Sequence, residues 1–218
     1  MPQLFPPSAD MWLRLGLLGL GGGIVMLVLL CLGLARSDYL TAVGFVVAQP
    51  VPFSHEHHVN GLRIDCRYCH DAVEVSANAG FPPTETCMTC HSQVWTGAPM
   101  LEQVRDSLAD DRPLHWQRVA KLPDYVYFHH DIHIHAGVGC VTCHGRVDEM
   151  PLMSRAEPFT MQFCVDCHRD PAPRLRPRTA ITDMTWTPPG NEPAYGHALM
   201  AKAGIDPRGL TDCAICHR

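Results

Sequence analysis

The stretch Phe128-His129-His130-Asp131-Ile132-His133, followed by Cys140-Val141-Thr142-Cys143-His144, decides the fold of this 218-residue chain. An earlier stretch repeats it, since Phe53-Ser54-His55-Glu56-His57-His58 precedes Cys66-Arg67-Tyr68-Cys69-His70. Each copy reads Phe-x-His-x-x-His, then a glycine, then a first and a second Cys-x-x-Cys-His cluster. The copies begin about 75 residues apart, and such a period indicates an internal duplication.

Every cysteine except Cys31 belongs to a Cys-x-x-Cys-His motif, the signature of covalent c-type haem attachment. Two cysteines three positions apart lie on one helical turn, where they match the two vinyl groups of the macrocycle, and the following histidine supplies the proximal ligand. Disulfide bonds would not place a histidine after every pair, a thioredoxin-like site needs one motif in a βαβ unit, and zinc ribbons lack the fixed histidine. We therefore expect five covalently attached c-type haems. The predicted attachment cysteines are Cys66, Cys69, Cys87, Cys90, Cys140, Cys143, Cys164, Cys167, Cys213 and Cys216, and the predicted proximal ligands are His70, His91, His144, His168 and His217.

Nine further histidines are available for the sixth positions of five irons. The duplicated Phe-x-His-x-x-His places two of them on one side of a turn, able to serve two neighbouring haems, which favours His55, His58, His130 and His133. The out-of-frame His57, His129 and His135 are expected at the surface or beside haem propionates. For the fifth iron the alternatives stay open: they are His115, His197, Met150 and Met161. Methionine ligation would raise the potential of that haem relative to two histidines.

The composition excludes several other classes of protein. A formal charge of −5, with Lys121 and Lys202 as the only lysines, offers no phosphate-binding stripe and argues against a nucleic-acid partner. A hydrophobic share of 46% argues against disorder. The 19 prolines and 17 glycines argue against long helices or a regular sheet outside the N-terminal region. A core built from side chains alone is weak, so we expect the haems themselves to form the core.

Residues 15–35 carry no charge and are long enough to cross a bilayer as a helix. The rival interpretation is a secretory signal cleaved at Gly33-Leu34-Ala35, but the apolar run is too long for one and no basic segment precedes it. We expect an uncleaved single-pass anchor in the inner (cytoplasmic) membrane. Because c-type haem is attached outside the cytoplasm, the haem domain is expected on the periplasmic side. Gly19 and Gly23 have the spacing of a helix-packing face, which predicts a membrane-embedded partner.

The predicted organisation has four parts: an anchor at 1–38, a first dihaem module with a connecting segment at 39–123, a second dihaem module at 124–172, and a C-terminal strap with the fifth haem at 173–218. One short helix is expected around residues 100–108. The strap, rich in proline and arginine, is expected to run over the surface.

The repeated module resembles the small multihaem cytochromes of the class III type. The whole chain is similar to the pentahaem cytochrome c component of alternative complex III, a bacterial quinol:electron-acceptor oxidoreductase. The similar stretches are Pro52–His55, Asp65–His70, Arg118–Val119, Leu122–Phe128, Gly145–Met150 and Cys216–Arg218. One departure matters, because the family usually has a histidine where this chain has Ala120, and this favours His115 as a replacement ligand.

The resemblance implies a mainly α and irregular multihaem cytochrome c domain with class III-like duplicated modules and one N-terminal transmembrane helix. It also implies partners: integral-membrane quinol-oxidising subunits, an iron–sulfur protein, a monohaem cytochrome c and a soluble periplasmic electron acceptor. The chain would relay electrons without a bond-making site of its own. Two alternatives are less favoured. A multihaem reductase needs one haem iron with an open sixth position, whereas spare histidines are plentiful here. A small membrane-anchored quinol dehydrogenase shares the anchor but lacks the duplicated module.

Overall fold

A computed structural model describes residues 4–190 and 192–217 of the chain. By contacts the chain divides into two units, Met1–Ala42 and Val43–Arg218, and each is described by itself. Residues 1–3 of the predicted anchor segment and Arg218 of the predicted family signature lie outside the described residues.

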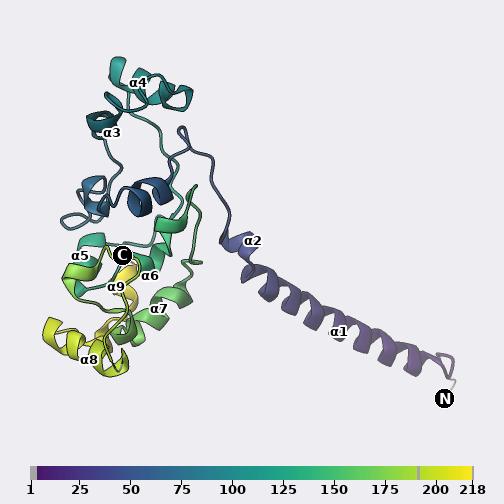
Figure 1. Cartoon of the computed structure of the whole chain (residues 1–218). Coiled ribbons are helices and arrows are strands. Elements are labelled where there is room, and N and C mark those ends of the chain that lie inside the picture. The colour runs from purple at the N-terminus through teal and green to yellow at the C-terminus, as the bar shows by residue number, and fades with distance from the viewer. Residues whose placement is uncertain (1–3, 191, 218) are drawn as a thin grey trace. The chain divides into compact units, whose positions relative to one another are not determined.

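The first unit contains one long apolar helix, α1 (Ala9–Ala35), and one short turn of helix, α2 (Asp38–Thr41). Figure 1 shows α1 as a single continuous helix. It begins before the uncharged run because Asp10 and Arg14 pair along its first turns, with 2.9 Å between carboxylate and guanidinium. None of its side chains is buried, its mean hydropathy reaches 2.5, and at 1.5 Å per residue it is about 40 Å long. By length and composition it is suited to cross a membrane.

The second unit consists of short helical turns joined by irregular chain, as its many prolines and glycines predict. Its elements are η1 (Glu56–Gly61), η2 (Cys66–Tyr68), α3 (Thr84–His91), η3 (Pro99–Leu101), α4 (Glu102–Ala109), α5 (His130–Ala136), α6 (Val141–His144), η4 (Val147–Glu149), α7 (Met161–Arg169), η5 (Ala172–Arg174), η6 (Arg178–Ala180), α8 (Glu192–Ala203), η7 (Pro207–Gly209) and α9 (Cys213–Cys216). In the described ranges β-structure is limited to three isolated bridges. The predicted mainly helical and irregular fold with one N-terminal apolar helix is confirmed.

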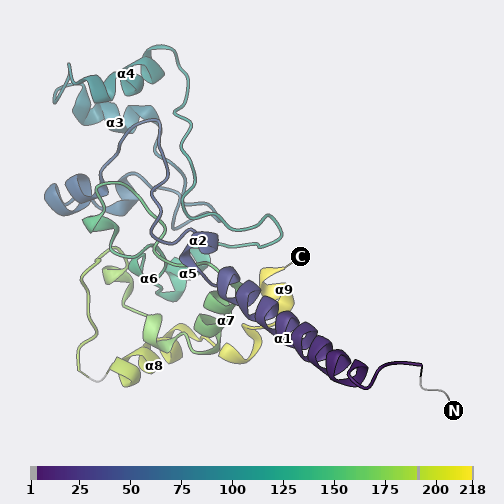
Figure 2. The same cartoon turned by 90° about the vertical axis from the view of Figure 1, so that its right-hand side faces the viewer.

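The predicted short helix in the connecting segment is also confirmed, since η3 and α4 together span 99–109. The helices α3 and α4 lie side by side in both views (Figures 1 and 2). Val51, Leu101 and Val104 form a small buried cluster there, with Cys87 and Trp116 packed against it.

The side-chain core of the chain is thin. Among the described residues only eleven hydrophobic side chains are buried, and no large side chain is less than 2% exposed. The accessible surface is 14,822 Å², whereas a folded monomer of 24.2 kDa is expected to expose about 10,000 Å². Part of the excess belongs to α1, whose side chains are all exposed. The rest fits an interior that a bulky prosthetic group completes.

The C-terminal strap differs from its expected course over the surface. Four of its side chains belong to the buried hydrophobic set, namely Leu175, Ala180, Ile181 and Met184. The guanidinium of Arg176 is also buried, where it donates to the carbonyl of Asp183 at 2.8 Å and lies 5.1 Å from the ring centroid of Trp186. The twelve-residue helix α8 follows in the same segment and was not predicted, because Pro193 and Gly196 lower its helix propensity.

Candidate functional site

All five Cys-x-x-Cys-His motifs lie on a helical turn, in η2, α3, α6, α7 and α9. In three of them the histidine N–H donates to the carbonyl of the first cysteine, at 2.9 Å for His70, 2.9 Å for His144 and 2.8 Å for His217. This bond brings both cysteines and the histidine to one end of the turn. The prediction that the two cysteines of each motif share a helical turn is confirmed.

The duplicated Phe-x-His-x-x-His segments have the same geometry in both copies. Phe53 stands edge-on to the ring of His55, with centroids 4.9 Å apart, and lies 4.4 Å from the ring of His58. In the second copy Phe128 lies 4.8 Å from His130 and 4.4 Å from His133. Each phenylalanine therefore fixes the orientation of two imidazoles. The duplication predicted from the sequence is present in the geometry.

These imidazoles face the histidines of the attachment motifs. The ring centroids of His58 and His91 lie 6.2 Å apart, those of His130 and His144 6.3 Å, and those of His133 and His168 6.1 Å. His55 is close enough to His70 for that neighbour to help lower the pKa of His55. With metal–nitrogen bonds of about 2.0 Å and roughly 1.1 Å from nitrogen to ring centroid, two imidazoles on opposite sides of one metal lie about 6.2 Å apart. The three measured separations match this value.

Hydrogen bonds at Nδ1 leave the other ring nitrogen, Nε2, free as a ligand. Among the motif histidines, Nδ1 donates to a backbone carbonyl in His70 (Gly80, 2.8 Å), His91 (Val94, 3.1 Å), His168 (Leu210, 2.8 Å) and His217 (Tyr125, 3.1 Å). Among their partners, the same holds for His58 (Ser54, 2.8 Å), His130 (Ala77, 2.8 Å) and His133 (His129, 2.7 Å). Such bonds fix the tautomer and ring orientation of metal-binding histidines.

Burial keeps several of these rings neutral, which is the ligating form. It lowers the pKa of His55 and of His144 to about 4, with neighbouring histidines adding to the effect. Burial also lowers the pKa of His58 and of His133. These four rings are therefore uncharged at neutral pH.

The cysteines of different motifs lie beside one another, and their contacts give the spatial order of the motifs. The Cys66 thiol lies beside that of Cys140, and this contact is the main reason that the pKa of Cys66 is raised. Burial and the neighbouring Cys87 raise the pKa of Cys69. Burial, then Cys167 and Cys164, raise the pKa of Cys143 to about 12. Burial and Cys216 raise that of Cys164. The motifs therefore follow one another in the order second, first, third, fourth, fifth.

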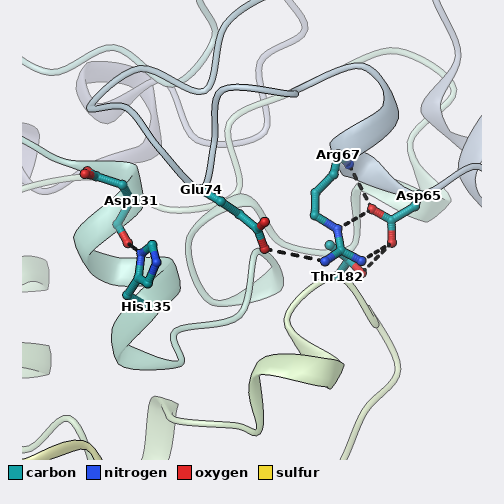
Figure 3. A network of polar contacts seen from close by, with 6 residues as sticks. All are labelled: Asp65, Arg67, Glu74, Asp131, His135 and Thr182. Atoms are coloured by element: carbon teal, nitrogen blue, oxygen red, sulfur yellow. Dashed lines mark hydrogen bonds and ion pairs between the residues drawn. The ribbon is translucent and has the colours of Figure 1, made fainter.

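A polar network ties the first motif to the C-terminal strap (Figure 3). The carboxylate of Asp65 accepts from the backbone N–H of Arg67 at 2.9 Å and so caps η2. The same carboxylate receives the Arg67 guanidinium at 2.8 Å and the Thr182 hydroxyl at 2.9 Å. The hydrogen bond from Arg67 is the main reason that the pKa of Asp65 falls to about 2. Glu74 pairs with the outer side of Arg67 at 3.5 Å.

The remaining predicted residues lie apart from these pairs. The rings of His115 and His197 are exposed, and neither contacts a motif histidine within the described ranges. Met161 is 72% exposed, and Met150 is half-buried with its sulfur 3.9 Å from the Ser154 hydroxyl. No ring contact joins His115 or His197 to His217 in the described ranges, and which of these four residues serves the fifth motif stays a prediction.

The three out-of-frame histidines, His57, His129 and His135, have contacts other than the motif histidines. His57 is exposed and stacks on Trp95 at 5.7 Å. His129 lies 3.5 Å from the Asp131 carboxylate. His135 is exposed and donates to the Asp131 carbonyl at 2.7 Å (Figure 3). Trp95 and Tyr125, which contact motif histidines, gave no signal in the sequence because single aromatic residues carry no spacing pattern.

The donor set fits haem better than a bare metal ion. A structural zinc site needs four ligands. Within the described ranges no group of even three histidine, cysteine or acidic side chains lies close enough together to hold a metal ion. Pairs of facing imidazoles suit a metal whose other positions are filled by a macrocycle. None of the eleven cysteines, all of which lie in the described ranges, is paired in a disulfide, which leaves the sulfurs of the motifs for thioether bonds.

Comparison with known proteins agrees with this geometry. The chain is similar to a multihaem cytochrome. Over 97 residues it is 35% identical to the multiheme cytochrome c subunit of the menaquinone reductase of Nitratidesulfovibrio vulgaris, strain Hildenborough. The match covers 44% of this chain and 45% of the relative, so the chain spans about half the length of the curated relative that it matches. No family model matches the chain. The similarity supports a multihaem c-type cytochrome.

Proposed function

We propose that this chain is a membrane-anchored c-type cytochrome with five covalent haems. In this proposal it relays electrons from a quinol-oxidising membrane complex to an acceptor outside the cytoplasm, as the pentahaem cytochrome of an alternative complex III. It makes and breaks no substrate bonds of its own. The name of the similar protein, which belongs to a menaquinone reductase, supports a link to quinone chemistry.

The observation that carries the proposal is the set of imidazole pairs at 6.1–6.3 Å. A c-type haem supplies reversible one-electron exchange at its iron. The chain's residues do the rest. The motif cysteines hold the macrocycles, the Nδ1 hydrogen bonds present Nε2 to the metal, and the lowered pKa values keep the buried rings neutral.

The order of the thiols supports a relay rather than isolated sites. Each motif has a cysteine beside a cysteine of the next motif in the spatial order, as Cys66 is beside Cys140. Attachment sites this close together bring successive cofactors into proximity. The second and the fifth motif stand at the two ends of the series.

A haem count tests this proposal directly. The pyridine haemochrome spectrum, measured against protein mass, is expected to give five c-type haems for each chain. Four or fewer would overturn the count, and haem extracted by acid–acetone would overturn covalent attachment.

The helix α1 is proposed as the anchor and as a contact to a membrane partner. A side chain added at Gly19 or Gly23 meets nothing within 4 Å in this chain, so the glycines are not required by its own fold. Gly19→Leu with Gly23→Leu should release the chain from its membrane partners without changing haem content. Gly21→Leu, on the opposite face of the helix, is the matched control. Intact co-purification of the double variant would contradict the packing face.

A second candidate is favoured by the name of the similar protein, which is a menaquinone reductase and therefore sends electrons toward the quinone. In both candidates electrons pass along the same series of haems, but in opposite directions. The native complex distinguishes them: an alternative complex III reduces a periplasmic acceptor with added menaquinol, whereas a quinone reductase oxidises a reduced cytochrome with added menaquinone. The proposed iron–sulfur and monohaem partners would be identified in the same preparation.

A further inference from the structure

The fifth motif differs from the other four in what faces its histidine. The Nδ1 of His217 donates to the carbonyl of Tyr125 at 3.1 Å, and the ring of Tyr125 stacks on the imidazole at 5.8 Å. The N–H of Tyr127 donates to the carbonyl of Cys216 at 2.8 Å. Residues 125–127 therefore hold the motif from the Nδ1 side of the ring. Nε2 points away from them, and no second imidazole faces it in the described chain.

All fourteen histidines lie in the described ranges, so every histidine that could face His217 can be placed. Five belong to motifs, and four more face the first four motifs. His57, His129 and His135 are held by Trp95 and by Asp131. His115 and His197 remain, and both are exposed without contact to the ring of His217.

The fifth motif is also more open to solvent than the third and fourth motifs. Cys213, Ala214 and Ile215 are exposed in α9, whereas the cysteines of the third and fourth motifs are half-buried. No imidazole of the described chain stands opposite His217, so the position there is left to a ligand from outside the histidine set. At the other four motifs an imidazole faces the motif histidine, and a phenylalanine of the duplicated segments packs against each of these rings.

We propose that the fifth haem, held by Cys213, Cys216 and His217, has a sixth position that no histidine of this chain fills and that binds small exogenous ligands. The ligand class is a small lone-pair donor: carbon monoxide on the ferrous iron, and cyanide or imidazole on the ferric iron. Binding forms one metal–ligand bond and transfers no electron. This inference rests on the proposed function, because it requires a haem at each motif.

The test uses the full-length chain with its haems, in detergent. Titration of the dithionite-reduced protein with carbon monoxide is expected to saturate at one ligand for each chain, that is, one for every five haems. The oxidised protein is expected to show one high-spin signal by electron paramagnetic resonance, which imidazole converts to low spin. Low-spin iron in all five haems, with no carbon monoxide bound, would overturn the inference while the haem count upheld the proposed function.

Two sets of variants locate the site. Cys213→Ala with Cys216→Ala should leave four covalent haems and abolish carbon monoxide binding. His115→Ala and His197→Ala should each leave binding at one ligand for each chain. If native protein bound none and one of these two variants gained a site, that histidine would be the sixth ligand and the inference would be wrong. A haem count of zero in the native protein would instead overturn the proposed function.

Discussion

His133 and His168 face each other with ring centroids 6.1 Å apart, although one lies in α5 and the other in the motif of α7. His58 and His91 repeat this relationship in the first copy of the module, at 6.2 Å. In both copies the second histidine of Phe-x-His-x-x-His pairs with the second motif. The first histidine is therefore left for the first motif, and His130 does lie 6.3 Å from His144.

The pairing predicts different effects for two histidines on one helix. His133→Ala should vacate the sixth position of one iron, so electron paramagnetic resonance should show one new high-spin signal and carbon monoxide binding should rise by one ligand for each chain. His135→Ala, two residues away in α5 with an exposed ring, is the matched control and should leave both readouts unchanged.

Haem number should stay the same in both variants, because the thioether bonds and the proximal His168 remain. The potential of the affected haem should shift, since the axial ligand is a main determinant of it. An unchanged low-spin spectrum in His133→Ala, or a new signal in His135→Ala, would show that the frame inferred from the duplicated segments is wrong.

The sequence predicts which histidines of Phe-x-His-x-x-His face the motifs, because the spacing of residues along the chain determines which side of a helical turn they occupy. Two histidines three positions apart fall on one side of a helical turn, and Phe53 and Phe128 then orient them identically. The spatial order of the motifs is invisible in the sequence, because the contact between Cys66 and Cys140 joins residues with no shared pattern.

Two other features could not be predicted from the sequence. The burial of Arg176 is one, since an arginine among prolines normally indicates solvent exposure. The lack of a second imidazole facing His217 in the described chain is the other. A count of surplus histidines does not separate ligands from surface residues, and His115 and His197 lie at the surface without a spacing pattern that would show it.

Gly139→Ala should destabilise the fold around the third motif. The methyl group would overlap the side chain of Arg176, which is buried and bonded to the Asp183 carbonyl, so the strap must shift to accept it. Overpacking of this kind costs about 1–3 kcal/mol. Gly97→Ala is the control, because a side chain there meets nothing within 4 Å. Thermal unfolding of the haem-loaded protein measures the difference, and equal midpoints in the two variants would contradict the close packing of Arg176.

A chain that has received no haem should form a disulfide between Cys66 and Cys140. The Cys66 thiol lies beside Cys140 and lowers the pKa of Cys140. The Cys140 thiolate would attack the mixed disulfide that Cys66 forms with a small-molecule or protein disulfide of the oxidising compartment, whose thiolate then leaves. Expression in an oxidising compartment without haem attachment, followed by peptide mapping under non-reducing conditions, should show the cross-link. Cys66→Ser is expected to abolish it. Disulfides within motifs, such as Cys66 to Cys69, would indicate that the thiols of different motifs do not approach each other before haem is attached.

The bond between Asp65 and Thr182 should make the attachment of the strap dependent on pH. The pKa of Asp65 is about 2 in the folded chain and 3.8 in its ordinary state, chiefly because Arg67 donates to the carboxylate. A lowered folded pKa means that the stabilisation is complete above about pH 4 and is lost as pH falls through about 2. Asp65→Asn should therefore destabilise the protein at neutral pH, and its difference from the native protein should fade in acid.

The partner hydroxyl gives the matched test of the same bond. Thr182→Val should cost about 1 kcal/mol at neutral pH by removing one hydrogen bond. Thr185→Val is the control, since that hydroxyl binds Asp183 within the strap itself. Denaturant unfolding at neutral and acid pH measures all three variants, and a gap between Asp65→Asn and native protein that persisted unchanged in acid would show that the Asp65 carboxylate does not hold the strap.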